Sequence, residues 1–103
     1  MFSVFISFQT VVSHVDILDI LNSVPFPNLG DLYSRLGLSE INVTNSKDGI
    51  ASSREREKMV LYTWKNINSK AATRDVILEA MSKDSTWKEW ENTLREKWGY
   101  PLV

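Results

Sequence analysis

The stretch SREREKMVLYTW, residues 53–64, changes from a run of five consecutive charged residues to an apolar segment that ends on a tryptophan. Ser52, just before it, stands three residues ahead of Glu55, which is the capping-box spacing that marks the start of a helix. Four apolar residues then fall within one arc of a helical wheel: Val60, Leu61, Trp64 and Ile67. The stretch therefore predicts a helix that buries this arc and turns its charged residues outward.

Apolar residues also recur at helical spacing upstream, across residues 11–23, until the segment VPFP of residues 24–27 ends the pattern. The predicted core stripe of this first helix consists of Val11, Val15, Leu18 and Leu21. Ile17 and Ile20 point away from that stripe, so we expect them to be either covered by residues 2–8 or exposed to solvent.

Two short helices are predicted next. Asn28 is the expected N-cap of the first, and Gly37 ends it. Its apolar face consists of Leu29, Leu32, Tyr33 and Leu36. Ser39 is the expected N-cap of the second, which reaches Val43, and residues 45–49 (NSKDG) form a predicted turn-rich loop.

Two further helices follow a break at Asn68-Ser69. Thr73 is the expected N-cap of the fifth helix, whose inward residues are Ile77, Leu78 and Met81. Thr86 and Glu89 repeat the capping-box spacing ahead of the last helix, which Gly99 closes. The stripe of the last helix is Trp87, Trp90, Leu94 and Trp98. At this spacing such a stripe is more often part of a core than a surface for stacking bases or a ligand.

The composition fits one globular domain. The chain has 103 residues, of which 43% are hydrophobic and 24% charged, so it can bury a core without disulfides or metals. We predict an all-α fold of six short helices, as one module over residues 1–103 in which residues 1–8 are an N-terminal extension, packed or flexible. The expected core includes Leu32, Leu36, Leu61, Trp64 and Ile77.

Charge and residue usage argue against several classes of protein. Twelve basic residues against thirteen acidic ones give a net charge of -1, whereas nucleic-acid binders usually carry a basic excess. The absence of cysteine excludes a disulfide framework and thiolate metal sites, and it fits an intracellular protein. The opening segment, residues 1–12, is too short and too interrupted by polar residues to span a bilayer, and it lacks a clear signal-peptide pattern.

No constellation of residues points to catalysis. The single histidine, His14, lies near the apolar side of the first helix, where a structural role is expected. One histidine without cysteine cannot provide zinc-ligand spacing, and the four glycines form no phosphate-binding loop. Three carboxylates of the last helix have basic neighbours, which indicates ordinary surface pairing: Glu89, Glu91 and Glu96. We therefore expect no enzyme, cofactor or metal.

The outer face of helix 53–67 has two open interpretations, a docking surface for another protein or a solvated face. Tyr62 is central on that face, and a tyrosine ringed by charges of both signs resembles an interface anchor with a polar rim. Asp31 and Arg35, an i,i+4 pair on the second helix, would extend such a surface. The candidate protein-binding residues are Asp31, Arg35, Lys47, Asp48, Arg54, Glu55, Lys58, Tyr62 and Lys65.

Three blocks of the sequence, taken in order, resemble the death domain. The first, LGDLYSRLGLSE of residues 29–40, is similar to the second helix and following turn, with Leu29 where that family often has tryptophan and a direct match over residues 36–39. The second is similar to the fourth helix through Arg54-Glu55, Val60-Leu61 and Trp64. The third is similar to the fifth helix through Ala72-Thr73, Ile77-Leu78 and Ala80-Met81.

The resemblance implies an antiparallel six-helix bundle that binds other death-fold domains, or itself, without catalysis. In that family the usual setting is cytoplasmic signalling towards apoptosis or innate immunity, in assemblies that resemble helical stacks with heterologous contacts. Caspase-recruitment and death-effector domains share the fold, so the branch stays open. Two other functions also stay open: a helix-turn-helix nucleic-acid-binding domain, which the net charge disfavours, and an architectural helical spacer.

Overall fold

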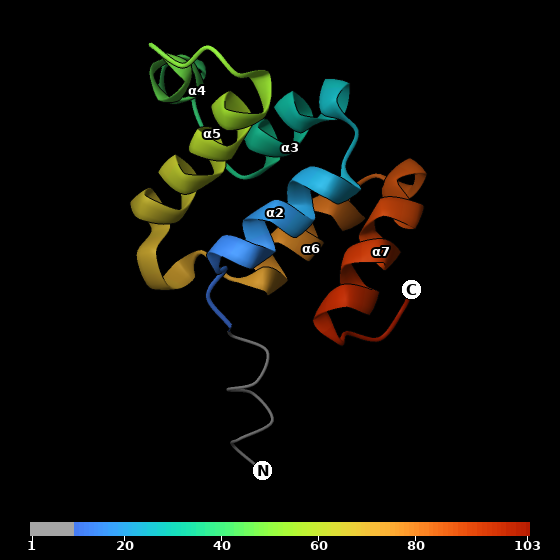
Figure 1. The fold of residues 1–103 in the computed structure, drawn as a ribbon. Coiled ribbons are helices and arrows are strands. Elements are labelled where there is room, and N and C mark those ends of the chain that lie inside the picture. Colours follow the sequence, from blue (N-terminus) through green and yellow to red (C-terminus); the bar gives the residue numbers. More distant parts are fainter. Residues whose placement is uncertain (1–9) are drawn as a thin grey trace.

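A computed structural model of the protein describes residues 10–103. These residues form six α-helices (Figure 1), which are α2 (His14–Ser23), α3 (Leu29–Arg35), α4 (Glu40–Lys47), α5 (Ser53–Asn68), α6 (Arg74–Ser82) and α7 (Lys88–Trp98). Three single-turn 3₁₀ helices join them, namely η1 (Phe26–Asn28), η2 (Ser69–Ala71) and η3 (Ser85–Trp87). Over this range no strand is present, and one isolated bridge pairs Val11 with Thr73. The predicted all-α fold of six helices is confirmed; the expectation for residues 1–8 lies outside the described residues.

Side-chain caps define where most helices begin. Ser39, Ser52 and Thr73 each accept a hydrogen bond from the backbone N–H three residues on, as predicted. Ser13, which the sequence analysis did not identify, forms a complete capping box with Asp16.

Two predicted caps are wrong. The side chain of Asn28 makes no capping hydrogen bond, because η1 leads directly into α3. Thr86 does not cap α7 either. Asp84 instead caps the preceding turn η3, accepting the Thr86 N–H at 2.9 Å, and α7 continues from that turn.

The predicted core stripe of the first helix is correct only for Leu21, which packs partly buried against the core. Ile17 and Ile20 are fully buried, whereas Val15 is 62% exposed and Val11 lies before the helix. Apolar residues cover most of the circumference of this helix, so its sequence alone offers two stripes. Packing decides between them, because α2 lies between α5 and α7 (Figure 1) and turns Ile17 and Ile20 inward.

Elsewhere the predicted core is largely correct. Leu32, Leu61, Trp64 and Ile77 are buried, while Leu36 is only partly buried. Ile67 is 57% exposed because it lies in the last turn of α5, so it does not belong to the buried arc. The stripe of the last helix packs into the core, with Trp90 partly and the rest fully buried: Trp87, Leu94 and Trp98.

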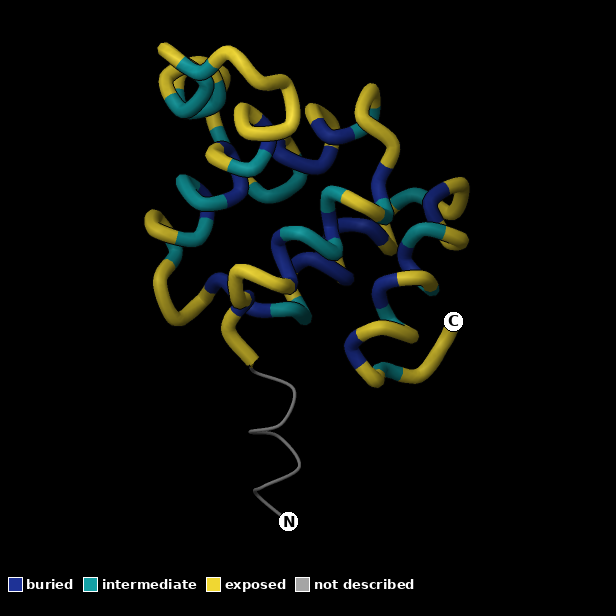
Figure 2. The backbone as a smooth tube through the Cα atoms, viewed as in Figure 1, coloured by how far each residue is buried: buried dark blue, intermediate teal, exposed yellow. Residues whose placement is uncertain are grey.

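Helix α4 is the least buried helix. It continues to Lys47, so most of the segment predicted as a loop is helical and the turn contains only Asp48 and Gly49, the latter with φ 74°. It has no fully buried residue and packs against α5 (Figure 2). In Figure 1 it lies at the edge of the molecule, on the far side of α5 from α7.

Candidate docking surface

Helices α2 and α5 run antiparallel and form a seam fixed by a polar contact at each end. His14 is hydrogen-bonded to the Tyr62 hydroxyl, and the two rings stack with centroids 5.8 Å apart. Eight residues further along α2, Asn22 accepts a hydrogen bond from Arg54 of α5 at 2.9 Å. Since Arg54 precedes Tyr62 by the same eight residues, the two helices keep one register along the whole seam.

Tyr62 therefore occupies a different position from the predicted one. It is half-buried against the core, and its hydroxyl contacts His14, so it is not a free anchor at the centre of an outer face. Its orientation follows from the helical period, which turns Tyr62 towards α2 while Met59 and Asn66 face solvent. His14 is itself exposed, which corrects its expected place on the apolar side of the first helix.

Three of the predicted charged residues precede Tyr62 on α5. Arg54 and Glu55 are exposed, and Lys58 forms an ion pair with Glu55 at 2.7 Å. An exposed pair of this kind contributes only about 0.2–1 kcal/mol, so a partner can displace it at small cost. The structure thus groups Arg54, Glu55, Lys58 and Tyr62, and Lys65 follows on the same helix as a half-buried residue.

Arg35 does not pair with Asp31, so that prediction is wrong. Its guanidinium lies 3.3 Å from the Asp84 carboxylate and 4.1 Å from the ring centroid of Trp87. These contacts tie α3 to the start of η3, whereas Asp31 stays exposed on α3. Arg35 thus makes a tertiary ion pair and a cation–π contact in place of an i,i+4 pair with Asp31 on its own helix.

Lys47 belongs to a polar network that reaches the interior. Its ammonium lies 3.1 Å from Glu57, a residue only 8% exposed, which also accepts a hydrogen bond from the Tyr33 hydroxyl at 2.9 Å. Burial and the charge of Glu57 raise the pKa of Tyr33, which keeps its hydroxyl protonated as a donor. Asp48 is exposed in the turn that follows Lys47. Lys47 is thus a structural partner of Glu57 as well as a surface cation.

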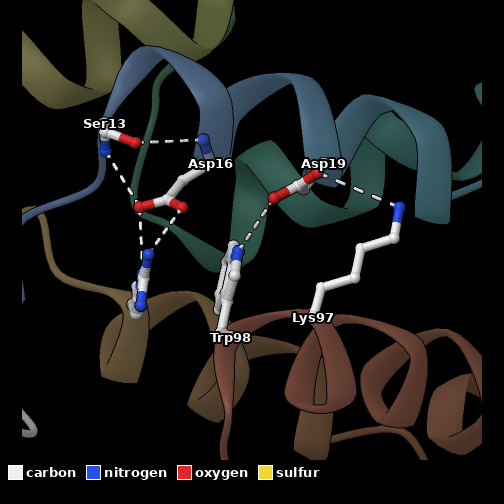
Figure 3. Close-up of polar contacts among 6 residues, drawn as sticks. Ser13, Asp16, Asp19, Lys97 and Trp98 are labelled. Atoms are coloured by element: carbon white, nitrogen blue, oxygen red, sulfur yellow. Dashed lines mark hydrogen bonds and ion pairs between the residues drawn. The ribbon is translucent and has the colours of Figure 1, made fainter.

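A second interior network joins α2 to α6 (Figure 3). The Asp16 carboxylate accepts two hydrogen bonds from Arg74, at 2.9 and 3.0 Å, and a third from the backbone of Ser13. Burial alone would raise the pKa of Asp16, but the bonds from Arg74 and Ser13 outweigh it and lower the pKa. The same bonds raise the pKa of Arg74. The pair stays ionised and connects the two helices.

Asp19, one turn later on α2, makes the equivalent link to α7. It accepts the indole N–H of Trp98 at 3.2 Å and lies 3.9 Å from the ammonium of Lys97 (Figure 3). Within α7 itself Glu91 is buried, 2% exposed, and pairs with Arg95 at 2.8 Å, so it is not the surface carboxylate that was expected.

Sequence reasoning missed these interior acids for an identifiable reason. Charge alone predicts a solvated position for Glu57 and for Glu91. Glu57, however, lies three, four and seven residues before the buried Val60, Leu61 and Trp64, so the wheel places it on the core face. The tertiary partners Tyr33 and Lys47 come from other helices, and nothing local in the sequence indicates them.

The described residues leave little interior chemistry free for a ligand. Across residues 10–103, every buried side-chain nitrogen or oxygen has a hydrogen-bond partner, and no group of histidine and acidic residues is arranged to hold a metal ion. No helix of this region combines the length and apolar character needed to cross a membrane.

Comparison with protein-family models, with curated proteins and with solved structures gives no match to this chain.

Proposed function

We propose that the chain is a non-catalytic protein-interaction module, an antiparallel bundle of death-domain type that binds other death-fold domains in cytoplasmic signalling towards apoptosis or innate immunity. The observation that carries the proposal is the α2–α5 seam, where charges of both signs precede a partly buried tyrosine on one helix. Its members are Arg54, Glu55, Lys58 and Tyr62. The death-fold part is supported by the motif blocks, which fall on α3, α5 and α6; the comparisons add no support to it.

The seam suits recognition of a protein for physical reasons. Tyr62 already has its ring ordered by His14, so covering its remaining exposed edge costs little additional side-chain entropy. Lys58 and Glu55 present both signs of charge, which selects partners by their charge pattern rather than by charge alone. Val15 and Met59, which are 62% and 38% exposed, add apolar surface on the same two helices.

A binding experiment tests this proposal. The full chain is titrated against immobilised death, caspase-recruitment and death-effector domains, and saturable binding to at least one of them is expected. Lys58→Glu should weaken that binding at low salt and matter less as salt rises, because it reverses one rim charge. The matched control is Lys88→Glu, an equal charge change on the exposed start of α7, which should bind like the parent.

Circular dichroism of both variants shows whether the fold is kept. If no death-fold domain binds, or if Lys58→Glu and Lys88→Glu bind equally, the proposal is wrong.

A further inference from the structure

Ile41 is the most exposed large apolar residue of the described chain, at 72%. Its helix, α4, is held to α5 by a hydrogen bond between the hydroxyls of Ser46 and Thr63 at 2.6 Å. The Ser46 side of α4 therefore faces α5, and Ile41, about 140° away on a helical wheel, projects into solvent. Glu40, the residue beside it, is exposed as well. Ile41 is thus an apolar projection with an acidic neighbour.

A pocket of matching chemistry lies elsewhere on the surface, where the end of α2, the turn η1 and the start of α5 meet. Its volume is about 340 Å³, near the lower limit of ligand sites. The lining residues are Leu21, Phe26, Leu29, Ser53, Arg54 and Glu57. Phe26, which is 51% exposed, forms the apolar part of this lining with Leu21 and Leu29, and the polar part comes from the start of α5.

The pocket has a net positive rim. The Glu57 carboxylate is already paired with Lys47, so its charge is compensated. Arg54, by contrast, is hydrogen-bonded to the neutral amide oxygen of Asn22, which orients the guanidinium without cancelling its charge. A fitting occupant is therefore an apolar side chain next to a carboxylate, and Ile41 with Glu40 is such a pair.

We propose that the occupant is a second copy of this chain, with Ile41 of one copy in the pocket of the next and Glu40 paired with Arg54. The projection and the pocket are different surfaces, so the contact is heterologous, and each copy can offer one surface while it receives the other. The contact rests on the proposed function only in treating the chain as an interaction module. Of the seam residues, only Arg54 takes part in it.

Sedimentation velocity over a range of protein concentrations tests the contact. The weight-average mass of the parent should rise above the monomer value of 11.8 kDa. Ile41→Asp and Phe26→Asp should each weaken association by about 30-fold or more, the effect of losing a hot-spot residue. Ile67→Asp is the matched control, since it makes the same change at a residue 57% exposed at the other end of α5, and it should associate like the parent.

Mixing two variants tests the heterologous geometry. Ile41→Asp keeps its pocket and Phe26→Asp keeps its projection, so an equimolar mixture should form a dimer and no larger species. Glu40→Arg and Arg54→Glu should each weaken association, and the two changes combined in one chain should restore it.

A monomeric parent, a mixture that stays monomeric, or equal loss in Ile67→Asp would each overturn this contact. Its failure is distinguishable from failure of the proposed function, because Lys58 lies outside the contact. Lys58→Glu should self-associate like the parent even where it loses binding to a death-fold domain.

Discussion

The half of the molecule formed by α2, α6 and α7 and the peripheral helix α4 are stabilised by different means. In the first region fully buried side chains such as Ile17 and Leu94 pack beside an interior ion pair. Helix α4 buries no residue fully: its half-buried Val43 packs against the core, and polar contacts of Ser46 and Lys47 join it to α5. Burial of apolar surface contributes about 25 cal/mol per Å², whereas a single neutral hydrogen bond contributes only about 1 kcal/mol net.

Under the proposed contact through Ile41, recognition would use a different part of the molecule from the one that provides most of the stability. A region with a large buried core opens only when the whole domain unfolds, while a helix held at its edge can open locally. Ile41 is presented on the second kind of element.

The largest effect is expected for Asp16→Asn. The substitution removes the charge from a buried acceptor of hydrogen bonds from Arg74, whose own side chain is 25% exposed, and losing charge-assisted bonds of this kind costs about 1.5–3 kcal/mol. Chemical denaturation at pH 7 measures the loss. Asp31→Asn, the same change on an exposed aspartate of α3, should alter the free energy of unfolding by less than about 0.5 kcal/mol.

The same pair gives a pH dependence whose sign is fixed. The folded pKa of Asp16 lies below its ordinary value of 3.8, so on acidification the unfolded chain takes up the proton first. The stabilisation is complete well above pH 3.8 and is lost as the pH falls through that value to the lower folded pKa. The difference between parent and Asp16→Asn should therefore shrink between pH 5 and pH 2. A constant difference would show that the carboxylate charge is not responsible.

Sequence reasoning succeeded where local signals decide the structure. Ser39, Ser52 and Thr73 cap their helices because the capping bond spans only three residues, and Gly99 ends α7 with φ 76°. It failed where distant residues decide. The buried face of α2 depends on which helices flank it, and the partner of Arg35 is Asp84, which is 49 positions away.

The candidate site divides in the same way. Sequence reasoning placed Glu55 and Lys58 together correctly because they lie one turn apart on one helix. The orientation of Tyr62 depends on His14, which belongs to another helix. The binding role of the whole candidate set stays a prediction.

A medium effect is expected in α4, and native-state hydrogen exchange can measure it. Amides of α4 should exchange through local opening, at a lower free energy than those of α2, α6 and α7. Ser46→Ala removes the bond to Thr63 and should lower the opening free energy of α4 by about 1 kcal/mol, with global stability nearly unchanged. Ser82→Ala, which removes a bond within α6 only, should leave α4 unaffected. If α4 amides exchange at the global free energy, the two regions do not differ as argued.

The smallest effect is expected at Ser69, which follows α5 and begins the connection to α6. Among the described residues it is the one non-glycine residue with positive φ, at φ 48° and ψ -117°. These angles correspond to the first central position of a type II′ turn, which glycine adopts without strain. Backbone strain of this kind lowers stability by about 1–3 kcal/mol. Glycine removes the strain but gives the unfolded chain more conformational freedom, which lowers stability by about 0.4–1 kcal/mol.

Ser69→Gly should therefore stabilise the domain by roughly 0.5–1 kcal/mol, raising Tm by a few degrees for a chain of this size. Ser34→Gly, the same substitution on the exposed side of α3, should lower stability, because glycine is a poorer helix former than serine. A rise in Tm for Ser69→Gly together with a fall in Tm for Ser34→Gly would distinguish relief of backbone strain from a general effect of glycine. If both variants lower Tm, Ser69 is unstrained, and the backbone at the junction between α5 and α6 does not reduce the stability of the domain.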